Sequence, residues 1–171
     1  MKIVGIIPAR YKSSRFEGKP LADIYGKPMI WWVYNQAKKV KEIDEVYVAT
    51  DDERIEKICK QLKINVVMTS DKHKTPLDRI QEFSDIIHAD LYVYINGDEP
   101  LIEPEVIKKI IPEINNFNDE YVANLITQIK NELDAADPTN IKVVTDDDNF
   151  GIYMSRSPIP YPKGVPTPIY R

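Results

Sequence analysis

The sequence predicts an α/β protein with a mostly parallel sheet, helices on both faces of that sheet, and an antiparallel hairpin near the C-terminal end. Short runs of β-branched residues alternate with segments whose apolar residues recur at helical spacing. Two strand-like runs close to the end are separated by only a turn. The 171 residues, of which 43% are hydrophobic, suffice for one substantial core.

The first expected strand leads into a basic loop. The apolar run Ile3 to Ile7 reads as a buried strand that ends at Pro8. Ligands in open α/β sheets bind beyond the carboxyl ends of the strands. The spacing fits neither a Walker A loop nor the dinucleotide fingerprint, so side chains are expected to bind the phosphates of a triphosphate or pyrophosphate. The loop contains four cations with small neighbours, namely Arg10, Lys12, Arg15 and Lys19 with Ser13, Ser14 and Gly18.

A solvated basic loop is the alternative interpretation, and the charge distribution counts against it. Residues 1–43 carry nine Lys and Arg against three Asp and Glu, a balance of +6, whereas the other residues carry 14 against 24, a balance of −10. The basic charge is therefore concentrated at this loop and the helix after it.

The next segments continue the alternation of helix and strand. Pro28 is expected to open a helix, with Trp31 in the core and Trp32 facing a neighbouring subunit. Glu45 to Thr50 reads as the second strand, and Asp51 is expected to cap the helix that follows. Cys59 lies on the apolar stripe of that helix, which favours a buried, inert thiol over a nucleophile.

The third and fourth strands are expected at Asn65–Met68 and Leu91–Ile95, with a helix between them that continues to His88. The fourth strand runs directly into the residues Asn96-Gly97-Asp98-Glu99-Pro100. Carboxylates at a rigid strand end, next to a glycine, suit a Mg²⁺-nucleotide site, with Asp98 as the metal ligand. A turn that only caps the next helix is the alternative.

The remaining chain is expected to add a helix from Pro104 to Ile114 and a fifth strand at Tyr121–Thr127. The hairpin follows, with strands at Ile141–Thr145 and Gly151–Ser155. Residues 157–171 carry five of the 13 prolines and are expected to form a surface tail. We therefore predict one nucleotide-binding domain over residues 1–156, followed by a Pro-rich tail over 157–171.

Composition excludes several classes of protein. No apolar run reaches membrane length and the N-terminus lacks signal-peptide features, so a cytoplasmic protein without a membrane partner is expected. A single cysteine and two histidines argue against a disulfide framework and a structural zinc site. The net charge of −4 argues against a nucleic-acid partner.

The basic loop also carries a family resemblance. Its sequence, I-I-P-A-R-Y-x-S-S-R-F-x-G-K-P-L, resembles the signature of the acidic-sugar cytidylyltransferases, most closely the 3-deoxy-manno-octulosonate (Kdo) cytidylyltransferases, or CMP-Kdo synthetases. The resemblance implies a Rossmann-like, nucleotide-diphospho-sugar transferase fold. It also implies that Arg10, Arg15 and Lys19 bind the CTP phosphates.

Three further segments are similar to the same family. His73 and Arg79 match the ends of H-x-S-G-T-[DE]-R, and the segment at Asn96 matches Q-G-D-E-P. The hairpin resembles N-x-[VI]-K-V-V and A-L-Y-F-S-R. The resemblance implies catalytic roles for Lys19, Arg10 and Asp98, with Asp98 holding Mg²⁺. Its implied nucleotide-binding residues are Pro8, Ala9, Arg10, Ser13, Arg15, Lys19, His73, Arg79, Asn96 and Asp98, and its implied sugar-binding residues are Tyr153, Ser155 and Arg156.

The implied function is transfer of CMP from CTP to Kdo or a similar acidic sugar by a cytoplasmic homodimer, for lipopolysaccharide assembly. Family chains continue beyond residue 171 with further sugar-binding and dimerisation residues and a second magnesium ligand. A nucleotide-binding module without catalysis is therefore one alternative. The residues Glu17, Thr75 to Leu77 and Asn96 depart from the family pattern, so a transferase for another acidic sugar or nucleotide is the other.

Overall fold

The computed structural model describes residues 1–13, 16–112 and 121–160. The chain divides into two compact units, Met1–Tyr121 and Val122–Arg171. That residues 1–156 form one nucleotide-binding domain stays a prediction. The greater part of the predicted Pro-rich tail, residues 161–171, lies outside the described residues.

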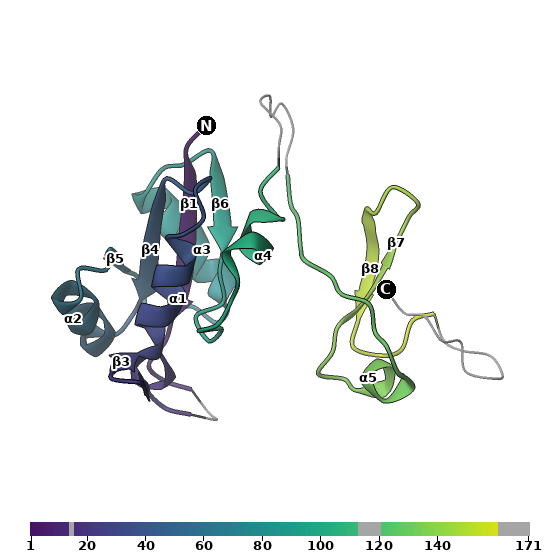
Figure 1. Ribbon diagram of the computed structural model, residues 1–171, viewed down its shortest axis with the longest axis horizontal. Coiled ribbons are helices and arrows are strands. Elements are labelled where there is room, and N and C mark those ends of the chain that lie inside the picture. Colours follow the sequence, from purple (N-terminus) through teal and green to yellow (C-terminus); the bar gives the residue numbers. More distant parts are fainter. Residues whose placement is uncertain (14–15, 113–120, 161–171) are drawn as a thin grey trace. The chain divides into compact units, whose positions relative to one another are not determined.

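The first unit is built on a four-stranded sheet with the order β5-β4-β1-β6 (Figure 1). The strands are β1 (Ile3–Ala9), β4 (Glu45–Thr50), β5 (Val66–Met68) and β6 (Leu91–Tyr94). All three pairings are parallel, so the carboxyl ends of the strands share one edge of the sheet.

Alternating residues of these strands divide the core into two clusters, as strand geometry requires. Ile3 and Ile7 pack on one face with helices α1 (Met29–Ala37), α2 (Glu53–Gln61) and α4 (Pro104–Lys108). Val4 and Ile6 pack on the other face, against α3 (Pro76–Ile86) and its buried Phe83. The predicted fold class, a parallel sheet with helices on both faces, is confirmed.

The strand β1 does not break at Pro8, as the sequence predicted, but runs on to Ala9. The carbonyl of Ile6 accepts a hydrogen bond from Ile95 N, so Ile6 bonds toward β6. Pro8 is two residues further along and therefore faces the same side, where pairing with β6 has already ended at Ile6. A proline is tolerated there because no ladder bond needs its missing N–H.

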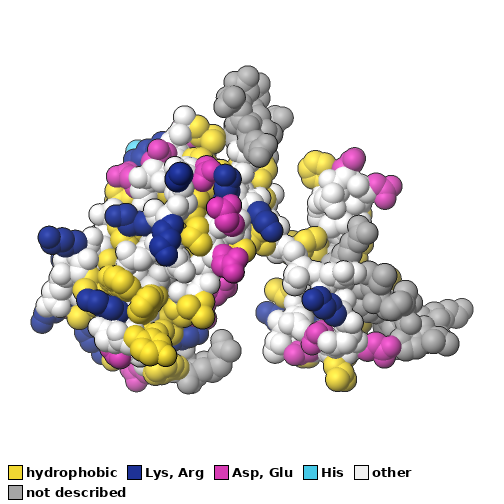
Figure 2. All heavy atoms as spheres, in the orientation of Figure 1, with side chains coloured by type: hydrophobic (Ala, Val, Ile, Leu, Met, Phe, Trp, Pro, Cys, Tyr) yellow, Lys and Arg dark blue, Asp and Glu magenta, His cyan; other side chains and the backbone are white. Residues whose placement is uncertain are grey.

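Two small features follow the basic loop. A 3₁₀ turn, η1 (Lys19–Leu21), is followed by a hairpin of β2 (Asp23–Ile24) and β3 (Lys27–Pro28). Figure 2 shows hydrophobic side chains gathered at the end of the first unit that carries this hairpin. Trp31 packs against the core as predicted. The indole N–H of Trp32 donates to the carbonyl of Ile24 at 2.9 Å, and its predicted contact with a neighbouring subunit stays a prediction.

Two predictions about helices need correction. Asp52, not Asp51, caps α2, because its carboxylate accepts a hydrogen bond from Arg54 N at 2.9 Å. The helix predicted from Pro104 to Ile114 ends at Lys108. Pro112 has no N–H to donate to the carbonyl of Lys108, so the α-helical ladder stops and tighter turns follow. Residues 113–120 lie outside the described part.

Cys59 is buried on α2, and burial raises the pKa of its thiol to about 12. This agrees with the predicted inert thiol, because the thiolate is the reactive form. None of the helices in the described part of the chain has the length and apolarity needed to span a bilayer.

The second unit contains α5 (Glu132–Ala136) and the predicted hairpin, β7 (Lys142–Thr145) paired antiparallel with β8 (Gly151–Ser155) (Figure 1). The strand predicted at Tyr121–Thr127 is absent, and the backbone there is irregular. Its residues have strand propensity, but no strand in the described part of the chain pairs with them, and Val122 is 90% exposed.

Candidate functional site

A cavity of about 430 Å³ lies at the carboxyl edge of the sheet in the first unit. The basic loop, the residues after β6 and the start of α3 surround it, as expected for a ligand site in a parallel sheet. Its lining residues are Pro8, Ala9, Arg10, Lys12, Ser13, Lys19, Pro20, Pro76, Arg79, Tyr94, Asn96, Gly97 and Asp98.

Parallel pairing explains why residues far apart in sequence meet here. β1 and β6 are neighbours, so Arg10 and Asp98 follow strands that end at the same edge. Gly97 allows the two strand ends to come close. A Cβ on Gly97 would lie 2.9 Å from the carbonyl oxygen of Pro8, a distance at which the backbone would have to shift.

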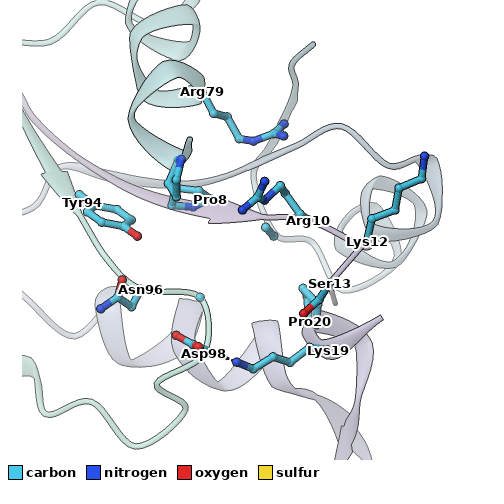
Figure 3. A pocket seen from close by; sticks show the side chains of 13 residues that line it. Pro8, Arg10, Lys12, Ser13, Lys19, Pro20, Arg79, Tyr94, Asn96 and Asp98 are labelled. Atoms are coloured by element: carbon cyan, nitrogen blue, oxygen red, sulfur yellow. Dashed lines mark hydrogen bonds and ion pairs between the residues drawn. The ribbon is translucent and has the colours of Figure 1, made fainter. Parts of the chain in front are cut away.

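Lys19 and Asp98 form an ion pair across the cavity, with 2.6 Å between Lys19 Nζ and Asp98 Oδ2 (Figure 3). The side chains are 33% and 48% exposed, so both remain accessible to a ligand. Among the described lining residues, Asp98 is the single carboxylate, against the four cations Arg10, Lys12, Lys19 and Arg79. This excess of positive charge suits a polyanion such as a triphosphate.

Arg79 is 1% exposed and reaches the cavity from α3. Its guanidinium donates to the Asp51 carboxylate at 2.7 Å and to the hydroxyl of Thr69. These partners directly follow β4 and β5, so Arg79 joins the ends of two strands as well as lining the cavity. Asp51 satisfies the buried charge of Arg79, which would otherwise carry a large desolvation cost.

His73 does not line the cavity, although the sequence grouped it with the nucleotide-binding residues. Its Nε2 bonds the carboxylate of Glu82 on α3, which also accepts a hydrogen bond from Ser70 N at 2.8 Å. These bonds, that of His73 foremost, hold the pKa of Glu82 below its usual value. His73 therefore ties the loop before α3 to that helix.

Tyr94 is a cavity residue that sequence reasoning missed (Figure 3). Burial raises the pKa of its phenol, and the carboxylates of Asp98 and Glu99 raise it further, while Arg10 opposes them. The available signal was its place at the end of β6, next to the polar segment. Asp51 was missed as the partner of Arg79, because its place at a strand end suggested a helix cap.

Not every predicted residue can be placed at the cavity. Eight of the predicted nucleotide-binding residues line it, namely Pro8, Ala9, Arg10, Ser13, Lys19, Arg79, Asn96 and Asp98. Arg15 lies outside the described residues. The predicted sugar-binding residues belong to the second unit, where Arg156 donates to the carbonyl of Pro138 at 2.8 Å and the Ser155 hydroxyl accepts from Ser157 N at 3.0 Å. Tyr153 on the same strand is exposed.

Comparison with known proteins agrees with this geometry. A family model described as cytidylyltransferase matches residues 4–171. The chain belongs to the cytidylyltransferase family. The match includes all the residues that line the cavity.

Similar members of the family are named 3-deoxy-manno-octulosonate cytidylyltransferase. The protein of Geotalea uraniireducens is 46% identical over 94% of this chain and 64% of its own length. The Escherichia coli protein is 42% identical over 96% of this chain and 66% of its own. The Arabidopsis thaliana protein, named as mitochondrial, is 43% identical over 95% of this chain and 56% of its own. The chain thus spans less than two thirds of the length of these relatives.

A solved structure of CMP:2-keto-3-deoxy-manno-octonic acid synthetase complexed with CTP is similar over 99% of this chain and 70% of its own. The TM-score is 0.92 at 40% sequence identity. A cytidylyltransferase from Leptospira borgpetersenii, at 24% identity and a TM-score of 0.58 over 65% of this chain and 48% of its own, shares the fold.

Proposed function

We propose that this chain carries the nucleotide site of an enzyme that transfers CMP from CTP to Kdo or a similar acidic sugar, with release of pyrophosphate. The observation that supports this most directly is the cavity with four cations and one carboxylate at the end of a parallel sheet. The names of the relatives, and the CTP complex of the similar solved structure, supply the substrates.

In the proposed reaction, the anomeric hydroxyl of the sugar attacks the α-phosphorus of CTP. A new O–P bond forms, the bond to the β-phosphate oxygen breaks, and the hydroxyl loses its proton. Catalysis then depends mainly on positioning and on neutralising the charge of the leaving pyrophosphate. Arg10 and Lys19, which line the cavity, are proposed to do this together with Arg15.

Asp98 fits the role of a magnesium ligand. The described part of the chain holds no group of three or more His, Cys, Asp or Glu that could bind a metal by themselves. A nucleotide-bound Mg²⁺ needs no such group, since one or two carboxylates suffice when phosphate oxygens and waters complete its shell. The half-exposed carboxylate of Asp98 provides one such ligand. When bound, the ion would neutralise phosphate charge.

The test measures pyrophosphate release from CTP and Mg²⁺, with and without Kdo. Kdo-dependent release supports the proposal, and release that another acidic sugar or nucleotide stimulates better would overturn the choice of substrate. Lys19→Met should abolish release without lowering the melting temperature. Lys60→Met removes a surface lysine, paired with Glu56 at 2.6 Å, and is the matched control with normal release. An active Lys19→Met variant would contradict the role of Lys19.

A nucleotide-binding module without catalysis is the second candidate. Every described residue that lines the cavity belongs to the first unit, whereas the proposed sugar residues Tyr153, Ser155 and Arg156 belong to the second. CTP binding without any Kdo-dependent release would favour this candidate.

A homodimer is also proposed from the family resemblance. Apolar side chains exposed in the second unit support it, including Phe150 and Ile152. Sedimentation of the chain as a monomer at micromolar concentration would count against it. A cytoplasmic location and a role in lipopolysaccharide assembly stay predictions.

A further inference from the structure

The ring of Tyr11 lies between the basic loop and helix α2. The guanidinium carbon of Arg54 is 3.3 Å from the centre of the Tyr11 ring, a close stacking contact. The ring also packs against the apolar core of the first unit. Neither side chain is among those that line the cavity. Both therefore lie outside the lining of the cavity.

Asp52 fixes the orientation of the Arg54 guanidinium. The carboxylate accepts from Arg54 Nε at 2.9 Å and from its terminal nitrogen at 2.7 Å, which is a bidentate geometry. Because Asp52 also caps α2, the guanidinium plane is tied to the start of a helix. The Asp52 carboxylate raises the pKa of the Arg54 guanidinium, and the charge of Glu17, in the loop itself, raises it further.

The same tyrosine contacts the end of the loop. Gly18 N donates to the carbonyl of Tyr11 at 2.8 Å, and Gly18 has a left-handed backbone with φ 69°. The Tyr11 ring would be 3.1 Å from a Cβ at Gly18, so ring and backbone are in close contact. The next residue is Lys19, whose Nζ pairs with Asp98. Tyr11 therefore contacts the residue that directly precedes Lys19.

We propose that Tyr11 and Arg54 are positioning residues whose stack holds Gly18 and Lys19, at the end of the basic loop, with Lys19 facing Asp98 before a nucleotide binds. The inference rests on the proposed function for the identity of the ligand, but not for the order of Gly18 and Lys19. Pre-ordering a loop improves affinity because less conformational freedom is lost on binding.

The test compares Arg54→Leu and Tyr11→Leu with three controls. Tyr11→Phe keeps the ring, Arg54→Lys keeps the charge without the planar stack, and Lys60→Leu removes another cation from the same helix. Two quantities are measured on the full chain: the hydrogen-exchange rate of the Gly18 amide by NMR without nucleotide, and the Kd for CTP with Mg²⁺ by calorimetry. Thermal unfolding checks that each variant is folded.

Both leucine variants are expected to exchange the Gly18 amide faster and to bind CTP more weakly, each by about two- to fivefold. Tyr11→Phe and Lys60→Leu should match the wild type, and Arg54→Lys should fall between. Unchanged exchange in the leucine variants would overturn the proposal, as would faster exchange with an unchanged Kd. If the wild type itself binds no CTP, the proposed function fails, and the exchange rates still decide whether the stack orders the loop.

Discussion

Two glycines in left-handed conformations distinguish the effect of the contact with Tyr11 from the effect of backbone strain. Gly18 has φ 69° and Gly26 has φ 77°, so alanine is strained at either position. Only at Gly18 would the new Cβ meet another side chain, that of Tyr11 at 3.1 Å, whereas nothing lies within 4 Å at Gly26. The two alanine variants thus share the same backbone strain and differ in the contact with the Tyr11 ring.

We expect Gly18→Ala and Gly26→Ala each to lose about 1 kcal/mol of stability from backbone strain, and Gly18→Ala to lose more, because its Cβ also meets the Tyr11 ring. Only Gly18→Ala should weaken CTP binding, because displacement of the loop moves Lys19 away from Asp98. Urea denaturation and CTP titration measure the two effects. Equal affinity of both variants for CTP would contradict the assigned path from Tyr11 to Lys19.

The carboxylate of Glu82 predicts an acid dependence of stability. His73, and then Ser70 N, hold the pKa of Glu82 below its ordinary value of 4.5. A carboxylate whose pKa is lowered by folding stabilises the native state above the unfolded pKa, and that stabilisation is lost as the pH falls through the folded pKa. The contribution should therefore be complete at pH 7 and disappear below about pH 4.5.

Glu82→Gln removes this titration while keeping an amide acceptor. The free energy of unfolding of the wild type should exceed that of the variant at pH 7, and the difference should shrink as the pH falls from 5 to 3. Urea unfolding at several pH values provides the measurement, and all other carboxylates cancel in the difference. A difference that does not change with pH would show that Glu82 is not charged in this pair.

Individual residues show where sequence reasoning stops. Lys19, Asp98 and Arg10 were placed correctly at one edge because they follow strands of a parallel sheet, which periodicity reveals. Asp52 takes the capping role that was expected of Asp51, since both residues favour helix caps and only the position of the buried Arg79 distinguishes them. Such a choice depends on a contact between residues 28 positions apart.

At the scale of elements, α3 begins with a complete capping box. Thr75 Oγ1 accepts from Asp78 N at 3.2 Å, and the Asp78 carboxylate accepts from Thr75 N at 2.9 Å. Pro76 occupies the first turn, where its missing N–H costs nothing. The residues that depart from the family pattern at this position thus form a sound helix start.

Thr75→Ala should lower the free energy of unfolding by about 1 kcal/mol, because one N–H of the first turn loses its acceptor. Thr75→Ser keeps the hydroxyl and should remain within a few tenths of the wild-type value. Because Arg79 lies in the first turns of α3, the alanine variant is also expected to bind CTP more weakly. Equal stability of the alanine and serine variants, measured by urea denaturation, would argue against the cap.

Local signals predicted some elements and failed for others. The bounds of β4 and the start of α3 follow from apolar periodicity and end signals within the segment itself. The strand expected at Tyr121–Thr127 failed because a strand exists only when another strand pairs with it, and propensity does not report a partner. The helix predicted from Pro104 was too long, because the apolar stripe beyond Lys108 was given more weight than Pro112, which ends a helix.

At the scale of the whole molecule, the cavity and the proposed sugar residues belong to different compact units. The four cations and Asp98 lie within residues 1–121, and the β7–β8 hairpin with Ser155 and Arg156 lies beyond them. The core clusters of the sheet also fall within the first unit. Nucleotide binding should therefore be separable from sugar use.

A fragment of residues 1–121 is accordingly expected to bind CTP with Mg²⁺ within about threefold of the full chain, which corresponds to a difference below 1 kcal/mol. The same fragment should show no Kdo-dependent release of pyrophosphate, because it lacks the hairpin. Circular dichroism must first show that it is folded, and Lys19→Met in the fragment controls for nonspecific binding. A folded fragment that fails to bind CTP, while the full chain binds it, would mean that the second unit contributes to the nucleotide site.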